Sequence, residues 1–170
     1  AGGKEDSLRY QLIRERVQLQ YEDTSGLAAK RFQAQLDENP KNDVARYGLA
    51  IAQIKGSQFK QARENLTALL AKAPNDITYN LALIQLEIDN NHLPDAQQRT
   101  DRMLTQYPGN YPLNQLRVDL LLKQNRTADA EKALDSLLKS RPDDPDVWYQ
   151  VAETRGLSGN IIGLHQARDE

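Results

Sequence analysis

The chain has 170 residues, of which 39% are hydrophobic and 27% charged, and its formal net charge is −2. No apolar run approaches the roughly 20 residues that a membrane-spanning helix needs, and no basic stripe with interleaved aromatic residues indicates nucleic-acid binding. Because the chain lacks cysteine, disulfide bonds and thiolate metal sites are excluded.

The chain opens on a polar stretch, residues 1–7, which we interpret as a cloning remnant or linker. The following segment, LRYQLIRERVQLQ, places Leu8, Leu12, Val17 and Leu19 at helical spacing and predicts a first helix over residues 8–20. A turn is expected at Thr24–Ser25–Gly26, followed by a second helix from about residue 27 to residue 37.

Beyond this point, three kinds of residue return at one fixed interval of 34 residues. The alanine column is Ala28, Ala62, Ala96 and Ala130, the proline column is Pro40, Pro74, Pro108 and Pro142, and the leucine column is Leu36, Leu70, Leu104 and Leu138. Three columns sharing one period predict structural repeats over residues 9–42, 43–76, 77–110 and 111–144, with a partial fifth over 145–170.

A 34-residue period with small residues at a helix crossing and a closing proline is typical of tetratricopeptide repeats. The expected fold is all-α: a solenoid of antiparallel helix pairs wound into a right-handed superhelix, with residues 8–170 as one domain of ten helices. Proline ends each second helix because it lacks an N–H. Thr100, in an otherwise apolar core column, is interpreted as tolerated packing. The fifth repeat stops at Glu170, partway through its second helix, which suggests a piece of a longer protein.

Catalytic chemistry is not indicated by the sequence. The only histidines are His92, expected to be solvated in a turn, and His165. Neither lies in an H-E-x-x-H motif, and no phosphate loop or nucleophile elbow is present. The Asp and Glu residues are expected on solvated helix surfaces. We therefore expect no catalytic, cofactor-binding or metal-binding residues in this chain, and a binding role instead of an enzymatic one.

The first helices of tetratricopeptide repeats line a groove, which they reach through about positions 2, 5, 9 and 12 of each repeat. The candidate partner groove combines apolar and aromatic residues in the N-terminal half with acidic or amide residues in the C-terminal half: Val44, Tyr47, Ile51, Thr78, Leu81, Gln85, Gln115, Asp119, Tyr149 and Glu153. Tyr47 and Tyr149 are the favoured contact residues, since a ring with a polar tip suits an interface.

Two alternatives qualify this interpretation of the groove. Ile54 and Ile88 reach the same side of their helices but are also candidates for packing against neighbouring helices. A clamp for a C-terminal carboxylate would need Lys at position 5 and Asn at position 9, and no repeat has that pair. A clamp for the C-terminal tail of a chaperone is therefore not expected.

The segments RPDDPDVWYQVAE (Arg141–Glu153) and GLHQAR (Gly163–Arg168) carry a resemblance to a known family. The chain resembles the C-terminal repeat region of BepA-type (YfgC-like) periplasmic zinc metalloproteases of Gram-negative bacteria, and departs from it at Asp169–Glu170. The resemblance implies a periplasmic location and a partner among the outer-membrane assembly machinery or its substrates. The zinc and the H-E-x-x-H site belong to a preceding catalytic domain, so none of its residues transfers to this chain.

Two other functions are compatible with the same residues. One is a free-standing tetratricopeptide adaptor, cytoplasmic or periplasmic, with no protease attached. The other is a set of repeats that only braces a catalytic domain in the same chain and has no external partner. An H-E-x-x-H motif upstream of Ser7 would favour the protease over the free adaptor.

Overall fold

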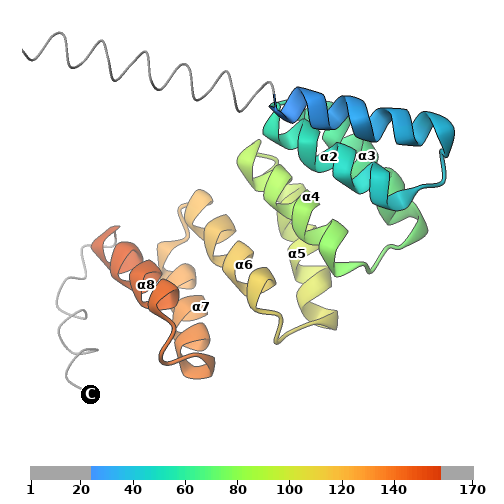
Figure 1. Cartoon of the computed structure of the whole chain (residues 1–170). Helices are drawn as coiled ribbons and strands as arrows, with labels where there is room; N and C mark the ends of the chain where they lie inside the picture. Colours follow the sequence, from blue (N-terminus) through green and yellow to red (C-terminus); the bar gives the residue numbers. More distant parts are fainter. Residues whose placement is uncertain (1–23, 158–170) are drawn as a thin grey trace, which may run out of the picture. The chain divides into compact units, whose positions relative to one another are not determined.

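The computed structural model describes residues 24–157, and this part of the chain is helical throughout, with no strand (Figure 1). Residues 24–38 form the first described helix. It is followed by α2 (Asp43–Lys55), α3 (Phe59–Lys72), α4 (Ile77–Asp89), α5 (Leu93–Gln106), α6 (Tyr111–Lys123), α7 (Thr127–Ser140) and α8 (Pro145–Leu157). The fold is the expected all-α arrangement of helix–turn–helix repeats. The predicted helix over 8–20 and the predicted end of the fifth repeat lie outside the described residues.

One predicted boundary was wrong. Thr24, Ser25 and Gly26 are helical instead of forming a turn. A glycine beside two hydroxyl residues is a turn signal, but these residues belong to helix 24–38, whose later residues pack against α2. Tertiary packing therefore outweighed the local propensity of these three residues.

Short polar side chains start the first helices of the repeats. The Oδ1 atoms of Asn42, Asp76 and Asn110 accept hydrogen bonds from the backbone N–H groups three residues later, at 3.0–3.1 Å. Such a cap satisfies one of the backbone donors that a helix start leaves without an intrahelical partner. The cap recurs at the 34-residue interval and therefore fixes where α2, α4 and α6 begin.

The turn between the two helices of a repeat is the same in three successive repeats. Ser57, Asn91 and Asn125 have φ values of 59°, 60° and 58°, in the left-handed region. In the second repeat the N–H of Ser57 bonds the carbonyl of Ile54 at 3.1 Å, and the N–H of Gln58 bonds that of Gln53 at 2.7 Å. This pair of bonds is the Schellman motif, which closes a helix and reverses the chain.

The alanine column lies in the core, as expected for a close helix crossing. Ala62, Ala96 and Ala130 are each 0% exposed. One turn later, Leu66, Thr100 and Leu134 are also buried. The Thr100 hydroxyl has no hydrogen-bond partner, which agrees with the interpretation of Thr100 as a tolerated core residue.

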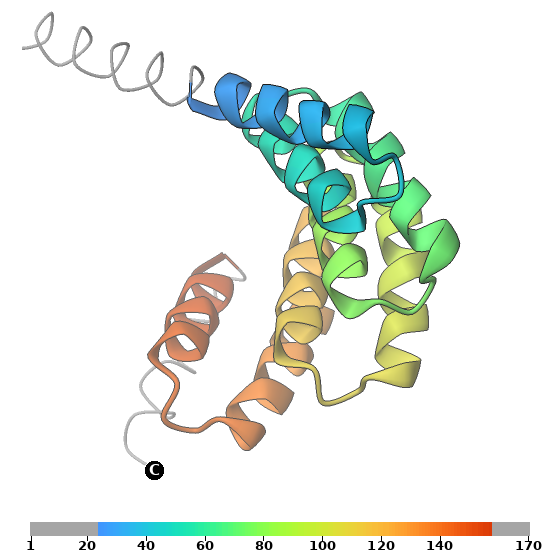
Figure 2. The ribbon, with the colours of Figure 1, turned by 45° about the vertical axis from the view of Figure 1, so that its right-hand side comes forward.

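The chain divides into two compact units, Ala1–Tyr79 and Asn80–Glu170, with the division inside α4. In the first unit α2 packs against α3. Helix 24–38 lies beside α2 (Figures 1 and 2), where Leu36, Ala45 and Leu49 form a small core. In the second unit α5 packs on α6, α6 on α7 and α7 on α8. A core cluster there joins residues of α6, α7 and α8.

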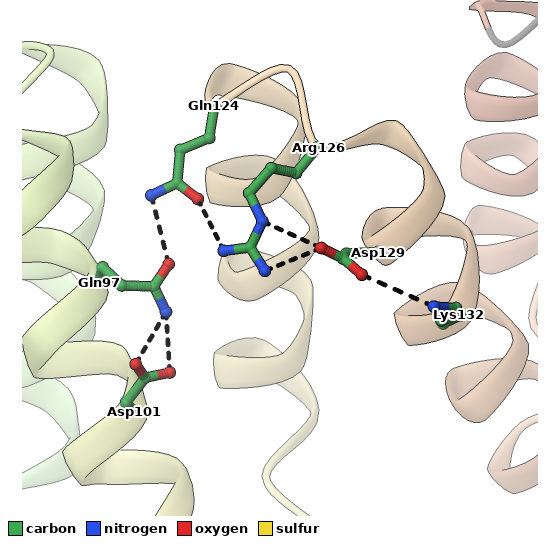
Figure 3. A network of polar contacts seen from close by, with 6 residues as sticks. All are labelled: Gln97, Asp101, Gln124, Arg126, Asp129 and Lys132. Atoms are coloured by element: carbon green, nitrogen blue, oxygen red, sulfur yellow. Dashed lines mark hydrogen bonds and ion pairs between the residues drawn. The ribbon is translucent and has the colours of Figure 1, made fainter.

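Partly exposed polar side chains link the helices of the second unit near the α6–α7 turn (Figure 3). Gln124 donates to Gln97 of α5 at 3.2 Å, and Arg126 donates to Asp129 of α7 at 2.8 and 3.0 Å. Because both side chains of the Arg126–Asp129 ion pair are about half exposed, this ion pair contributes little to the free energy of unfolding.

One acidic residue departs from the expectation of solvated carboxylates. Glu87 of α4 is 1% exposed, and both of its carboxylate oxygens accept hydrogen bonds from Arg99 of α5. A charge at this depth is retained because its counter-charge is held in bidentate geometry. The prediction that all carboxylates are on solvated surfaces was therefore wrong at this position.

Candidate protein interface

The exposed face of α2 presents three of the sequence-predicted groove residues. Val44 is 78% exposed, and Tyr47 and Ile51 are half-buried. Their spacing of three and four residues places them on one side of the helix. The Tyr47 ring lies 5.4 Å from that of Tyr79 in α4, at an interplanar angle of 44°. Together these side chains form an aromatic and aliphatic strip, which we call the α2 strip: Val44, Tyr47, Ile51 and Tyr79.

The sequence reasoning did not select Tyr79. It lies at position 3 of its repeat, next to the predicted groove residue Thr78, which is exposed. The cap at Asp76 fixes the start of α4 and so brings the Tyr79 ring beside that of Tyr47. The signal that could have revealed Tyr79 is the presence of two tyrosines near the starts of successive first helices.

Both phenols of the strip remain protonated at neutral pH. Burial raises the pKa of Tyr47 above its ordinary value, and the neighbouring Tyr79 and Asp76 raise it further. Burial also raises the pKa of Tyr79, with added contributions from Asp76 and Asp43. The two hydroxyls can therefore act as hydrogen-bond donors to a partner.

A cavity of about 390 Å³ adjoins the strip. It lies between helix 24–38 and α2, and its lining is mostly apolar: Thr24, Ser25, Ala28, Phe32, Tyr47, Gly48, Ile51, Ala52 and Lys55. Gly48 makes room for the Phe32 ring, because a Cβ at Gly48 would lie only 2.5 Å from that ring. The cavity is large enough to receive several aliphatic carbons of a docked segment.

The first helices of the second compact unit present a more polar face. Gln85 is exposed and donates to Asp89 at 2.8 Å, and half-buried Gln115 donates to the Tyr111 hydroxyl at 2.9 Å. Tyr149 is 70% exposed. An aromatic ring this exposed has most of its surface available to a partner.

Asp119 lies among like charges on this face. Burial raises the pKa of its carboxyl, and the carboxylates of Asp89 and Glu153 raise it further, while Lys123 acts in the opposite direction. Asp119 therefore lies close enough to Asp89 and to Glu153 for each of these carboxylates to repel its charge. Among residues 24–157, no group of three or more His, Cys, Asp or Glu side chains could hold a metal ion.

Two other aromatic residues of this unit are engaged within the fold. The Arg141 guanidinium lies 4.1 Å from the centre of the Tyr111 ring, and the Trp148 indole N–H donates to the Pro142 carbonyl at 2.7 Å. These contacts hold α6 and α8 to the C-terminal end of α7. Of the two aromatic residues in α8, Tyr149 is therefore the more exposed, at 70% against 37% for Trp148.

Comparison with known proteins identifies the repeat. Residues 26–86 and 87–153 each match the family model for the tetratricopeptide repeat. The chain belongs to the tetratricopeptide-repeat family. Tetratricopeptide repeats bind proteins or peptides and are typically non-catalytic, so this chain is a protein-interaction module by family.

Several solved structures have the same fold at low sequence identity, and two of them are of tetratricopeptide-repeat proteins. A protein from Parabacteroides merdae is 15% identical over 85% of this chain, with a TM-score of 0.76, and this chain spans 57% of its length. One from Thermus thermophilus is 24% identical over 89% of this chain and 82% of its own, with a TM-score of 0.66. MamA of MSR-1 is 19% identical over 88% and 91%, with a TM-score of 0.64. The comparison with curated proteins gave no match.

The predicted groove residues divide between the two compact units of the tetratricopeptide-repeat chain. Val44, Tyr47, Ile51 and Thr78 belong to the first unit, and the second holds Leu81, Gln85, Gln115, Asp119, Tyr149 and Glu153. Leu81 is half-buried and Glu153 is exposed. Their role in binding stays a prediction.

The structure also shows the burial of three further residues that the sequence analysis discussed. Ile88 is 2% exposed and belongs to the core, so it is not a groove residue, whereas Ile54 is half-buried. His92 is exposed in the α4–α5 turn, as predicted. Among the described residues, no helix is long and apolar enough to cross a bilayer.

Proposed function

We propose that this chain is the protein-interaction module of a BepA-type periplasmic zinc metalloprotease. In this role its first helices bind the outer-membrane assembly machinery or its substrates, and a catalytic domain preceding the repeats cleaves misassembled proteins. The protease and the periplasmic location rest on the resemblance of Arg141–Glu153 and Gly163–Arg168 to that family. The binding role rests on the tetratricopeptide repeat and on the α2 strip.

The α2 strip is the single observation that carries the binding role. Val44 leaves 78% of an aliphatic side chain exposed, and Tyr47 and Tyr79 form an aromatic pair beside it. Exposed apolar residues that gather on one face mark sites for partners, and aromatic residues supply much of the binding energy at interfaces. The outer face of α3 in the same unit differs, since it exposes Lys60, Gln61 and Glu64.

The chemistry of the strip favours a polypeptide partner with apolar side chains. Aliphatic and aromatic carbon provides the contact area, and the two protonated phenols can donate to backbone carbonyls. A partly assembled β-barrel protein exposes such side chains and backbone groups.

Site-specific photocrosslinking in the periplasm of a Gram-negative host tests the proposal. A photoreactive phenylalanine analogue at Tyr47 should form crosslinks to outer-membrane assembly proteins or nascent β-barrel proteins. The same analogue at Lys139, exposed on α7, is the matched control and should give few crosslinks. Crosslinks at position 139 but not at position 47 would contradict the assignment of the face.

A separate observation tests the attachment to a protease. The gene should encode an H-E-x-x-H motif on a predicted helix upstream of this segment. A gene without that motif would make the chain a free-standing tetratricopeptide adaptor and would remove the zinc from the proposal, while leaving the binding role of the α2 strip intact.

A further inference from the structure

The second compact unit holds an arginine against an aromatic ring and a carboxylate. The Arg141 guanidinium carbon lies 4.1 Å from the centre of the Tyr111 ring, and a guanidinium nitrogen lies 3.6 Å from a carboxylate oxygen of Asp144. The Tyr111 hydroxyl donates a hydrogen bond to the same carboxylate. A planar guanidinium can make the cation–π contact and the ion pair at once. These three residues therefore form a complete arginine-binding arrangement within the chain.

The first compact unit repeats the backbone of this arrangement with alanine in place of the arginine. Asp76 and Asp144 are two repeat intervals apart, and each carboxylate accepts a hydrogen bond from the backbone N–H three residues later. Ala73 precedes Asp76 by three residues, as Arg141 precedes Asp144. Their backbone conformations agree, with φ and ψ of −131° and 74° at Ala73 and of −142° and 69° at Arg141. A methyl group has no charge, so Ala73 cannot supply the cation that Arg141 supplies.

Tyr47 and Tyr79 supply the aromatic surface in the first unit. Tyr47 lies one helical turn beyond the position that Tyr111 has in its repeat, and therefore on the same side of its first helix. The rings of Tyr47 and Tyr79 are 5.4 Å apart. Burial raises the pKa of both phenols, and the charge of Asp76 raises each pKa further, so this carboxylate lies near both rings. A cation that contacts either ring therefore has a carboxylate close by.

A lysine of the same unit already places a cation beside the aromatic pair. The Lys72 ammonium pairs with the Asp43 carboxylate at 2.6 Å. Burial, Asp76 and Asp43 raise the pKa of the Tyr79 phenol, and the charge of Lys72 acts in the opposite direction. Both side chains of the Lys72–Asp43 pair are about half exposed, and such pairs contribute little to stability. A cation from a partner can therefore replace Lys72 beside Asp43 with little loss of stability.

We propose that the α2 strip binds an arginine side chain of its polypeptide partner, which lies against the tyrosine rings and pairs with Asp43 and Asp76. This inference rests on the proposed function and adds the charge of the partner to it. Two carboxylates and one ammonium line this part of the strip, so charge complementarity favours a basic side chain. Arginine suits the site better than lysine, because a guanidinium stacks on a ring and binds a carboxylate through two N–H groups. The exposed aliphatic side chain of Val44 can contact a residue that flanks the arginine.

A pair of synthetic peptides tests the inference. Both have capped ends and the same alternating valine and serine residues, but one has a central arginine and the other has citrulline, its uncharged isostere. Isothermal titration measures the dissociation constant of each peptide. The arginine peptide should bind about five- to thirtyfold more tightly, which is the range for a cation that contacts an aromatic ring and is partly desolvated. Added salt should reduce this difference, because it screens the charges.

Removal of the two carboxylates assigns the preference for arginine to this site. Asp43→Asn with Asp76→Asn should abolish most of the preference, and asparagine retains the ability to cap α4 at position 76. Asp37→Asn with Glu64→Gln is the matched control, because it changes the net charge equally at two exposed carboxylates of the same unit. The control should keep the preference for arginine.

Ala73→Arg gives a second test, because it supplies the arginine from within the chain. The new side chain should occupy the site as Arg141 does beside Tyr111, and should weaken binding of the arginine peptide at least about fivefold. Ala71→Arg, at an exposed position of α3, adds the same charge and should weaken binding much less. Equal weakening by the two variants would show that only the added charge matters and would overturn the site.

The contrary results with the peptides bear differently on the inference and on the proposed function. Equal binding of the two peptides, with both weakened by Tyr47→Ala, would overturn the arginine site and leave the binding role of the α2 strip intact. Binding of neither peptide would also overturn the arginine site, and photocrosslinking at Tyr47 would then decide the proposed function. A preference for arginine that survives Asp43→Asn with Asp76→Asn would assign the arginine to another face.

Discussion

Arg99 of α5 holds the buried carboxylate of Glu87 in α4 through two hydrogen bonds of 3.2 Å, one to each oxygen. The Arg99 head is itself mostly covered, since 23% of its side chain is exposed. This pair joins the two helices of one repeat and places a charged carboxylate among mostly apolar core residues.

Arg99→Ala should lower the free energy of unfolding by about 3 kcal/mol, because it removes the guanidinium from a buried charge. Urea unfolding measures this change. Lys72→Ala is the control: the Lys72–Asp43 distance is only 2.6 Å, but both groups are about half exposed, so its loss should cost less than about 1 kcal/mol. Equal costs would show that Glu87 is solvated in the folded state.

The alanine column permits a test of the helix crossing. Ala62→Leu adds three carbons at a site that is 0% exposed, and overpacking of this kind costs about 1–3 kcal/mol. Lys60→Leu, on the same helix but at an exposed position, should change stability by less than about 0.5 kcal/mol. Thermal unfolding of the two variants side by side decides the question, and similar midpoints would contradict the crossing.

The turn at Ser57 is strained in a way that glycine relieves. Ser57 has a φ of 59°, and a left-handed conformation costs a residue with a Cβ roughly 1–2 kcal/mol. Ser57→Gly should therefore raise the free energy of unfolding by about 0.5–1 kcal/mol after the added entropy of the unfolded chain is subtracted. Ser57→Ala, which keeps the Cβ, should bring no such gain. A gain of equal size in both variants would point to the hydroxyl instead of the backbone.

Asp119 should make stability depend on pH. Its folded-state pKa is raised above 3.8 by burial and by Asp89 and Glu153, so its ionisation destabilises the fold at neutral pH. This destabilisation disappears as the pH falls through the raised pKa. Asp119→Asn should therefore be more stable than the unmodified chain at pH 7, and the difference should shrink toward pH 3.8.

Urea unfolding across this pH range measures the difference. Asp143→Asn, at an exposed carboxylate, is the matched control and should show no comparable gain at pH 7. If the advantage of Asp119→Asn grew as the pH fell, the sign of the pKa shift would be the reverse of the one described.

The repeating residues predicted the fold because each column has a physical role that few residue types can fill. Only a small side chain fits where Ala62 lies between two helices, and a short polar side chain such as Asn42 caps the next helix. These roles depend on local geometry, which the period reveals. The helix pairs and their inner faces were therefore predictable.

The errors arise where a distant contact outweighs a local signal. Glu87 was expected on a solvated surface, since most carboxylates are there, but Arg99 lies twelve residues further on and neutralises it within the core. The sequence left Ile88 open between the groove and the core, and its burial assigns it to the core. The pairing of Tyr47 with Tyr79 depends on how α4 begins and on packing within the first compact unit, which the pattern of one helix does not reveal.

The central claim is that the α2 strip binds a polypeptide, and the affinity of the Tyr47→Ala variant tests it most directly. The probe is the outer-membrane protein that crosslinks at position 47, and the dissociation constant is measured by isothermal titration. Loss of an aromatic contact residue costs about 2 kcal/mol or more, and 1.4 kcal/mol corresponds to a factor of ten. Tyr47→Ala should therefore weaken binding at least about tenfold with the helical circular dichroism unchanged, whereas Lys139→Ala should bind as the unmodified chain does. Unchanged affinity of Tyr47→Ala together with weakened binding by Lys139→Ala would contradict the claim and assign the partner to another face.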